Sequence, residues 1–200
     1  MKQNYMQDTR STRGYLKRFY PYVFVLVLFI PGVRQPLSSL TQSAVLKSGF
    51  LDAAPQVDNK ETFDFNFKIK DLSGNKIEFE SLRGKVIFLN LWATWCAPCR
   101  SEMPAIQSLY NGMDKENISF VMLSLDKDTH IEKVRGYVKE KGFTFPIYMP
   151  SGFLADQLQV PSIPTTFVIS KDGKIAMKEV GMKNYNTTKF KNFLKELEKK

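Results

Sequence analysis

The central part of the chain contains apolar segments of the length and spacing expected for β-strands. Residues 63–69 alternate between apolar and polar side chains, which predicts a strand with one buried face. Residues 85–92 and 118–125 are nearly unbroken apolar runs, as expected for central strands buried on both faces. Further strands are predicted at 145–149, 165–170 and 174–180, and the last two flank a hairpin turn signal at 171–173.

Helical segments are predicted between and after these strands. Residues 97–110 should form a helix that is interrupted at Pro104, because proline has no backbone N–H to donate. Residues 129–141 form a second predicted helix, and the segment 185–200 a third with one apolar face. Strands that alternate with helices, followed by an antiparallel hairpin and a last helix, predict an α/β fold with a mixed sheet covered by helices on both faces.

The amino end has a different pattern. The apolar run 19–33 follows five Lys and Arg residues and is followed by Arg34. It is shorter than the roughly 20 residues of a typical membrane-spanning helix and suits an export signal. Basic residues before the run predict the amino end in the cytoplasm and the rest outside it. We therefore expect a signal or membrane anchor at 1–34, cleaved or retained, a linker or stalk helix at 35–57, and the folded domain at 58–200.

The net charge of +9 lies partly in this amino end. Residues 1–54 carry seven Lys and Arg against two Asp, which leaves 22 basic against 18 acidic residues in the rest of the chain. The basic residues of the predicted domain are interleaved with acids, and no Lys- and Arg-rich stretch with aromatic residues is present. Nucleic acid is therefore not an expected partner.

The stretch LWATWCAPCR, residues 91–100, contains the only two cysteines of the chain, Cys96 and Cys99. A structural zinc site needs about four ligands, and the only histidine, His130, is distant in sequence. A structural disulfide across two residues closes almost no loop and would stabilise the fold little. The pair therefore indicates a disulfide that is formed and broken during function, with no metal and no cofactor.

The position of the pair favours thiol chemistry. Cys96 falls between a predicted strand and a predicted helix, where free N–H groups and the helix dipole stabilise a thiolate. This makes Cys96 the expected attacking sulfur. Pro98 stiffens the first turn of the helix, where a missing N–H is harmless. Cys99 should be more buried and should resolve the mixed disulfide.

The segments WATWCAPCRSEMP and VPSIPTTFVI resemble the thioredoxin superfamily and, within it, the TlpA/ResA-like membrane-tethered thiol-disulfide oxidoreductases. The resemblance covers roughly residues 60–198 and does not extend to residues 1–54. It implies a thioredoxin-like sheet with an amino-terminal β-hairpin and a strand-helix insertion after the active-site helix. Residues 118–149 have the length for that insertion.

The resemblance also implies roles for individual residues. Cys96 corresponds to the nucleophile and Cys99 to the resolving thiol, while Pro164 stands where the family keeps a cis-proline that faces the cysteines. The backbone of Ile163 would pair with the substrate. The expected substrate-binding residues are Trp95, Ala97, Pro98, Ile163 and Pro164.

Two polar residues near the pair raise separate questions. Glu102 is either a first-turn acid that suits the helix dipole or a carboxylate that accepts a proton from Cys99. In the ResA-like branch a glutamate at this place matters to activity. Asn90 stands where many thioredoxins have a buried acid, and this departure leaves more of the proton transfer to Glu102 or to water.

These observations predict a thiol-disulfide oxidoreductase of the cell envelope or periplasm, anchored in the membrane, that reduces disulfides in exported proteins. By resemblance, apocytochrome c during cytochrome c maturation is one expected client. A thiol-disulfide electron donor in the membrane would re-reduce the pair, because the external compartment is oxidising.

Two other functions stay open. A thiol peroxidase would need a Pro-x-x-x-Thr-x-x-Cys pattern, which is missing before Cys96. A copper chaperone of the same fold would space its cysteines by three residues and carry a late histidine beside the sheet, which does not describe His130.

Overall fold

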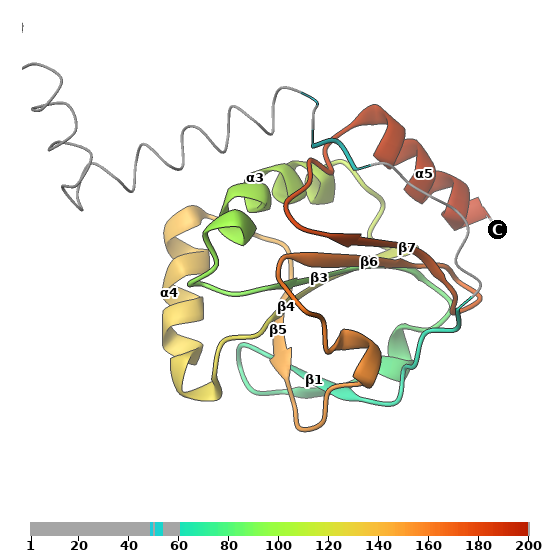
Figure 1. Cartoon of the computed structure of the whole chain (residues 1–200). Coiled ribbons are helices and arrows are strands. Elements are labelled where there is room, and N and C mark those ends of the chain that lie inside the picture. The colour runs from blue at the N-terminus through green and yellow to red at the C-terminus, as the bar shows by residue number, and fades with distance from the viewer. Residues whose placement is uncertain (1–48, 50, 54–60, 200) are drawn as a thin grey trace, which may run out of the picture. The chain divides into compact units, whose positions relative to one another are not determined.

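The computed structural model describes residues 49, 51–53 and 61–199 (Figure 1). Within them, seven strands form one mixed sheet in the order β2-β1-β5-β4-β3-β6-β7. The strands are β1 (Lys68–Asp71), β2 (Lys76–Glu78), β3 (Val86–Trp92), β4 (Ile118–Ser124), β5 (Ile147–Pro150), β6 (Thr165–Ile169) and β7 (Ile175–Val180). The helices are α3 (Ala97–Asn111), α4 (Ile131–Lys141) and α5 (Thr188–Lys199), with short 3-10 helices η1 (Phe79–Leu82), η2 (Asp128–His130) and η3 (Asp156–Leu158).

The strand before the cysteine pair, β3, lies in the interior of the sheet between β4 and β6. Every residue of β3 is buried, as its nearly unbroken apolar sequence predicts. It pairs in parallel with β4 and antiparallel with β6, so its carboxyl end is fixed from both sides. The central strand is therefore a rigid support for the residues that follow it.

The two expected additions to the thioredoxin-like sheet are present. Strands β1 and β2 form an antiparallel hairpin at one edge. After α3, the segment β4-α4-β5 forms a parallel unit, and β5 also pairs antiparallel with β1. The insertion thus connects the hairpin to the central strands.

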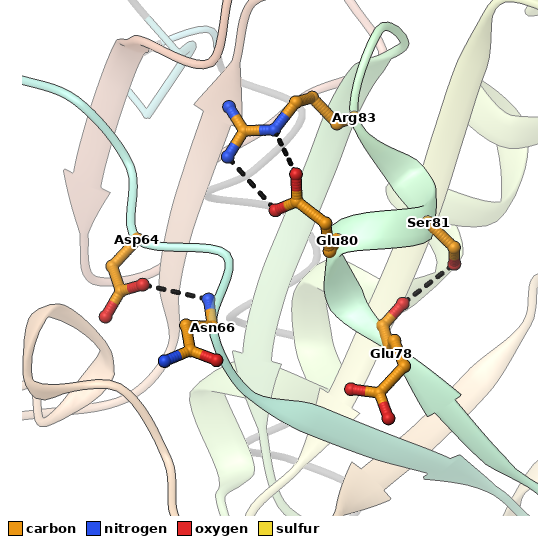
Figure 2. Close-up of polar contacts among 6 residues, drawn as sticks. All are labelled: Asp64, Asn66, Glu78, Glu80, Ser81 and Arg83. Atoms are coloured by element: carbon orange, nitrogen blue, oxygen red, sulfur yellow. Dashed lines mark hydrogen bonds and ion pairs between the residues drawn. The ribbon is translucent and has the colours of Figure 1, made fainter.

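The predicted strand at 63–69 starts later than its alternating pattern indicates. Its aromatic residues are buried, but residues 63–67 belong to no ladder, and β1 begins at Lys68. The reason is local hydrogen bonding: the Asn66 N–H donates to Asp64 Oδ1 at 2.8 Å (Figure 2). The Phe67 N–H also donates to the Phe65 carbonyl at 2.8 Å. Side-chain and short-range bonds of this kind compete with strand pairing.

The 3-10 helix η1 packs against the buried aromatic residues of the segment 63–67. Arg83 donates two hydrogen bonds to the Glu80 carboxylate, and Ser81 Oγ donates to the Glu78 carbonyl (Figure 2). The Arg83 guanidinium also lies 4.1 Å from the centre of the Phe65 ring. A half-exposed ion pair contributes little by itself, so we attribute the position of η1 mainly to the burial of Phe79.

Helix α3 continues through Pro104, contrary to the predicted interruption. Proline removes one backbone hydrogen bond, but the residues on both sides remain anchored, because Met103, Ile106 and Leu109 are fully buried. Ser108 Oγ donates to the Pro104 carbonyl at 3.0 Å. Packing of the apolar face therefore outweighs the local preference of one residue.

The elements that cover the sheet also differ from the prediction of helices on both faces. Helices α3, α4 and α5 contribute their buried apolar side chains to one hydrophobic cluster, together with Phe88, Trp92 and Met177. The other cluster consists of the opposite side chains of the sheet, residues 63–67 and the 3-10 helices η1 and η3. Figure 1 shows α3 and α5 on one side of the sheet and η3 on the other. Among residues 61–199, aromatic side chains and 3-10 turns cover the second face instead of an α-helix.

Residues 51–53, which precede the predicted domain, contact the loop between β7 and α5. The backbone of residues 51–53 pairs with Asn184: the Asn184 N–H donates to the Leu51 carbonyl, and the Ala53 N–H donates to the Asn184 carbonyl. Ala53 is buried in the first cluster. These contacts hold the loop between β7 and α5 in place.

No helix among residues 49, 51–53 and 61–199 has both the length and the apolar character needed to cross a membrane. The predicted signal or anchor at 1–34 lies outside the described residues, as does most of the predicted linker at 35–57.

Candidate active site

The two cysteines lie at the carboxyl end of β3 and the amino end of α3. They are joined by a disulfide bond, with their Cα atoms 5.3 Å apart. Cys96 is the N-cap residue of α3, and its sulfur accepts a hydrogen bond from the Cys99 N–H at 3.2 Å. Cys99 is completely buried, and Cys96 retains 5% of its accessible surface. Cys96 is therefore the sulfur that a partner can reach, in agreement with the sequence prediction of a more buried Cys99.

The loop before β6 faces the pair. The Ile163–Pro164 peptide bond is cis, as the resemblance implied. The Ile163 carbonyl oxygen lies 3.7 Å from Cys96 Sγ. Ile163 is partly exposed and Pro164 is buried, so the backbone of Ile163 forms the accessible rim beside the reactive sulfur.

Glu102 is fully buried, three residues after Cys99 on α3. Its Oε1 accepts from Asn90 Nδ2 at 2.8 Å, and its Oε2 accepts from the Lys183 N–H at 3.1 Å. Burial raises the pKa of the Glu102 carboxyl to about 8, and the two hydrogen bonds oppose this increase without cancelling it. Glu102 is thus a buried acid that gains or loses a proton near neutral pH.

The amide of Asn90 connects Glu102 to β6. Asn90 Nδ2 donates to both Glu102 Oε1 and Thr166 Oγ1, each at 2.8 Å, and all three side chains are completely buried. Tyr185 is buried beside them, and burial together with the Glu102 carboxylate holds the pKa of its hydroxyl well above the ordinary value. The contact of Asn90 with Glu102 was not predicted, although a polar residue within the apolar run 85–92 was a signal for it.

The other predicted substrate-binding residues form the exposed border of the pair. Trp95 exposes 64% of its surface, Pro98 is exposed and Ala97 is partly exposed. They lie on both sides of Cys96 in sequence, so a protein that approaches this sulfur must contact them.

Asp126, two residues after the end of β4, is buried and fixes the segment that leads to Cys96. Its carboxylate accepts hydrogen bonds from the backbone N–H and the hydroxyl of Thr94 and from the Ser124 hydroxyl, at 2.7–2.8 Å. The turn between β3 and Cys96 is therefore held by the end of β4.

The loop between β7 and α5 was also missed, and it contacts both sides of the site. The Gly181 N–H donates to the Pro164 carbonyl at 2.8 Å, and the Lys183 N–H donates to Glu102. These contacts use backbone atoms of the loop, so no side-chain motif could reveal them.

The comparisons with known proteins agree with this geometry. A model of the AhpC/TSA family matches residues 61–178, more than half of the chain. The chain belongs to the AhpC/TSA family. Its thioredoxin-like character is supported by the thioredoxin-like protein YneN of Bacillus subtilis, which is 35% identical over 117 residues, 58% of this chain and 68% of that protein.

This member of the AhpC/TSA family is also similar to proteins named thiol-disulfide oxidoreductase ResA, as the sequence resemblance indicated. The protein from Bacillus cereus is 39% identical over 117 residues, which cover 58% of this chain. The chain spans 66% of the length of that relative, slightly less than two thirds.

Solved structures confirm the thioredoxin-like fold. StoA of Bacillus subtilis aligns with a TM-score of 0.52 and 27% identity, over 66% of this chain and 94% of that one. A thiol:disulfide interchange protein of the thioredoxin family from Chlorobium tepidum aligns with a TM-score of 0.54 and 26% identity, over 74% and 99% of the two chains.

Proposed function

We propose that this protein is a thiol-disulfide oxidoreductase that reduces disulfides in exported proteins through Cys96 and Cys99. The observation that carries the proposal is the bonded cysteine pair at the start of α3, with one sulfur accessible beside the Ile163 backbone and a buried carboxyl three residues after the other.

In the first step the Cys96 thiolate attacks one sulfur of a partner disulfide. A bond forms between Cys96 and that sulfur, the partner disulfide breaks, and its second sulfur leaves as a thiolate. The Cys99 N–H, which donates to Cys96 Sγ, stabilises the attacking thiolate as an N-cap contact.

In the second step Cys99 releases the partner. The Cys99 thiol gives its proton to the Glu102 carboxylate, and the resulting thiolate attacks Cys96 Sγ. The mixed disulfide breaks, the partner leaves with two reduced sulfurs, and Cys96 and Cys99 form the disulfide of the structure. Two electrons pass from the pair to the partner, and a donor must return them.

We assign the protein to the cell envelope on the basis of the predicted amino-terminal signal or anchor. The electron donor would be a thiol-disulfide protein of the membrane, because an external compartment does not re-reduce disulfides. Apocytochrome c is the client that the ResA-like resemblance suggests.

The proposal predicts a defined product for each cysteine variant. The purified and reduced full chain is mixed with one equivalent of the aromatic disulfide DTNB, and the release of nitrothiobenzoate is followed by absorbance. The wild-type chain should release two thiols in two phases, and the second phase should be independent of concentration. Cys99→Ser should stop after one thiol, with the other bound to Cys96, and Cys96→Ser should lack the fast first phase.

The alternatives give different results. Catalytic consumption of hydrogen peroxide with a thiol donor by Cys99→Ser would favour a thiol peroxidase. No specific observation favours a copper chaperone: His130 is exposed at the start of α4, and in the part of the chain that the structure describes no three His, Cys, Asp or Glu side chains are grouped to hold a metal. A reduction potential near that of strong oxidants, about −120 mV, would reverse the proposed direction.

A further inference from the structure

The hydrogen bonds of Asn90 leave one of its polar atoms unpaired. Nδ2 donates to Glu102 Oε1 and to Thr166 Oγ1, both at 2.8 Å, while the buried Oδ1 has no hydrogen-bond partner. Buried polar atoms without a partner are uncommon, so this acceptor calls for an explanation.

The two oxygens of Glu102 face different kinds of donor. Oε2 accepts from the Lys183 backbone N–H, which can only donate. A proton on Oε2 would therefore point at another hydrogen. The favoured site for a proton on the carboxyl group is Oε1, the oxygen beside Asn90.

A protonated Oε1 would in turn conflict with the present orientation of Asn90, because the Glu102 O–H would meet the N–H of Nδ2. A half-turn of the side-chain amide exchanges Nδ2 and Oδ1 and presents an acceptor to that O–H. The Thr166 hydroxyl accepts in one orientation and donates in the other. In the second orientation Oδ1 accepts from both hydroxyl groups, and Nδ2 takes the position in which Oδ1 now has no partner.

We propose that Asn90 is a positioning residue for Glu102 that holds both protonation states, donating from Nδ2 to the carboxylate and accepting at Oδ1 from the carboxyl group after its amide turns. This inference rests on the proposed function, in which Glu102 receives the Cys99 proton. An aspartate could not replace it, because a second carboxylate at this place would couple to Glu102 and compete for the proton.

Few other ionisable groups surround Glu102 among the described residues. They are Cys99, three residues earlier on α3, and Lys183 and Tyr185 on the loop between β7 and α5, with Glu179 of β7 paired to Lys183. Tyr185 keeps its proton at neutral pH because it is buried beside Glu102. The cysteines and Glu102 are therefore the groups whose protonation changes during the reaction.

The second phase of nitrothiobenzoate release tests the inference. In the wild-type chain its rate should rise with pH as Glu102 becomes ionised. Asn90→Ala removes a charge-assisted hydrogen bond from the carboxylate, so the midpoint should move up by about one pH unit and the phase should slow severalfold at pH 7. Asn90→Asp should give a pH profile with two steps. The first phase should change less than twofold in both variants.

A double-mutant cycle separates this role from a structural one. In a Glu102→Gln background, Asn90→Ala should have little further effect on the second phase. An equal slowing in both backgrounds, or an unchanged midpoint in Asn90→Ala alone, overturns the inference. If the wild-type chain itself releases no second thiol, the proposed function fails instead.

A measurement on the unaltered chain guards against variants that do not fold. The side-chain amide nitrogen of Asn90, followed by NMR, should shift with the same midpoint as Glu102, and Glu102→Gln should abolish that shift. An Asn90 amide signal that is insensitive to pH between 6 and 10 in the wild-type chain would also overturn the inference.

Discussion

Trp95 is the residue at the site whose position is hardest to explain by stability alone. It exposes 64% of its surface directly before Cys96, although a tryptophan gains much from burial. Tryptophan is enriched in the parts of protein interfaces that contribute most to binding. We therefore expect Trp95 to contact the partner protein during the first step.

Trp95→Ala should raise the KM for reduction of a protein disulfide such as that of insulin by about tenfold and leave the unfolding free energy nearly unchanged. Phe153→Ala provides a matched control, because Phe153 exposes 67% of its surface in the loop after β5. Equal KM changes in the two variants would mean that Trp95 has no special contact. The small disulfide DTNB should distinguish the variants less than insulin does.

At the same scale, the sequence predicted the residues of the motif but not their polar partners. Cys96, Cys99 and Pro164 stand in recognisable segments, so their juxtaposition followed from the resemblance. Asn90 and Thr166 are 76 residues apart, and only the antiparallel pairing of β3 with β6 brings them together. A contact that depends on strand register cannot be predicted from the local sequence pattern.

Among the elements, the loop between β7 and α5 has the widest influence on the site. It donates to Pro164 through Gly181 and to Glu102 through Lys183, and it is held in turn by residues 51–53. Gly181 has a φ of +86°, a conformation that other residues adopt only with strain. A change there should therefore affect both sides of the active site.

Gly181→Ala should cost about 1–2 kcal/mol of unfolding free energy and slow the second phase of the DTNB reaction. Gly74→Ala is the matched control: Gly74 has a φ of +91° in the turn between β1 and β2, and an added Cβ would meet no atom within 4 Å at either glycine. The two variants should lose similar stability in urea denaturation. Only Gly181→Ala should slow the second phase. If that variant, like Gly74→Ala, leaves the rate of the second phase unchanged, the loop does not control Glu102.

Element boundaries were predicted less well than element types. The pattern at 63–69 identified the buried aromatic residues but not the local bonds of Asp64 and Phe65 that delay the strand. The proline rule predicted a break at Pro104 because it considers one backbone bond, whereas the helix is fixed by three buried side chains in the same region. In both cases interactions outside the local pattern decided the outcome.

At the scale of the whole molecule, the site combines a rigid sheet with an ionisable group inside the main core. The cluster that receives all three α-helices also contains both cysteines, and Glu102 is buried on α3 beside it. A carboxyl buried among apolar side chains favours its neutral form. The stability of the fold therefore depends on the protonation of Glu102, the group that accepts a proton in the proposed second step.

This arrangement predicts that the oxidised protein loses stability as the pH rises. The pKa of Glu102 is about 8 in the folded state and near its ordinary value of 4.5 in the unfolded state, so the folded chain binds more protons between these two values. The contribution is fully present below pH 4.5, decreases on the way to pH 8 and is lost above it. We expect Glu102 to lower the unfolding free energy by on the order of 4 kcal/mol across that range.

Urea denaturation at a series of pH values should reveal this loss in a comparison with Glu102→Gln, which removes the ionisable group and keeps the shape of the side chain. The two proteins should have similar stability near pH 4.5, and the variant should become progressively more stable than the wild-type chain up to pH 8, because it buries no charge. Parallel pH profiles would show that Glu102 keeps its ordinary pKa in the folded state. The same result would remove the physical basis for a proton transfer from Cys99 to Glu102 near neutral pH.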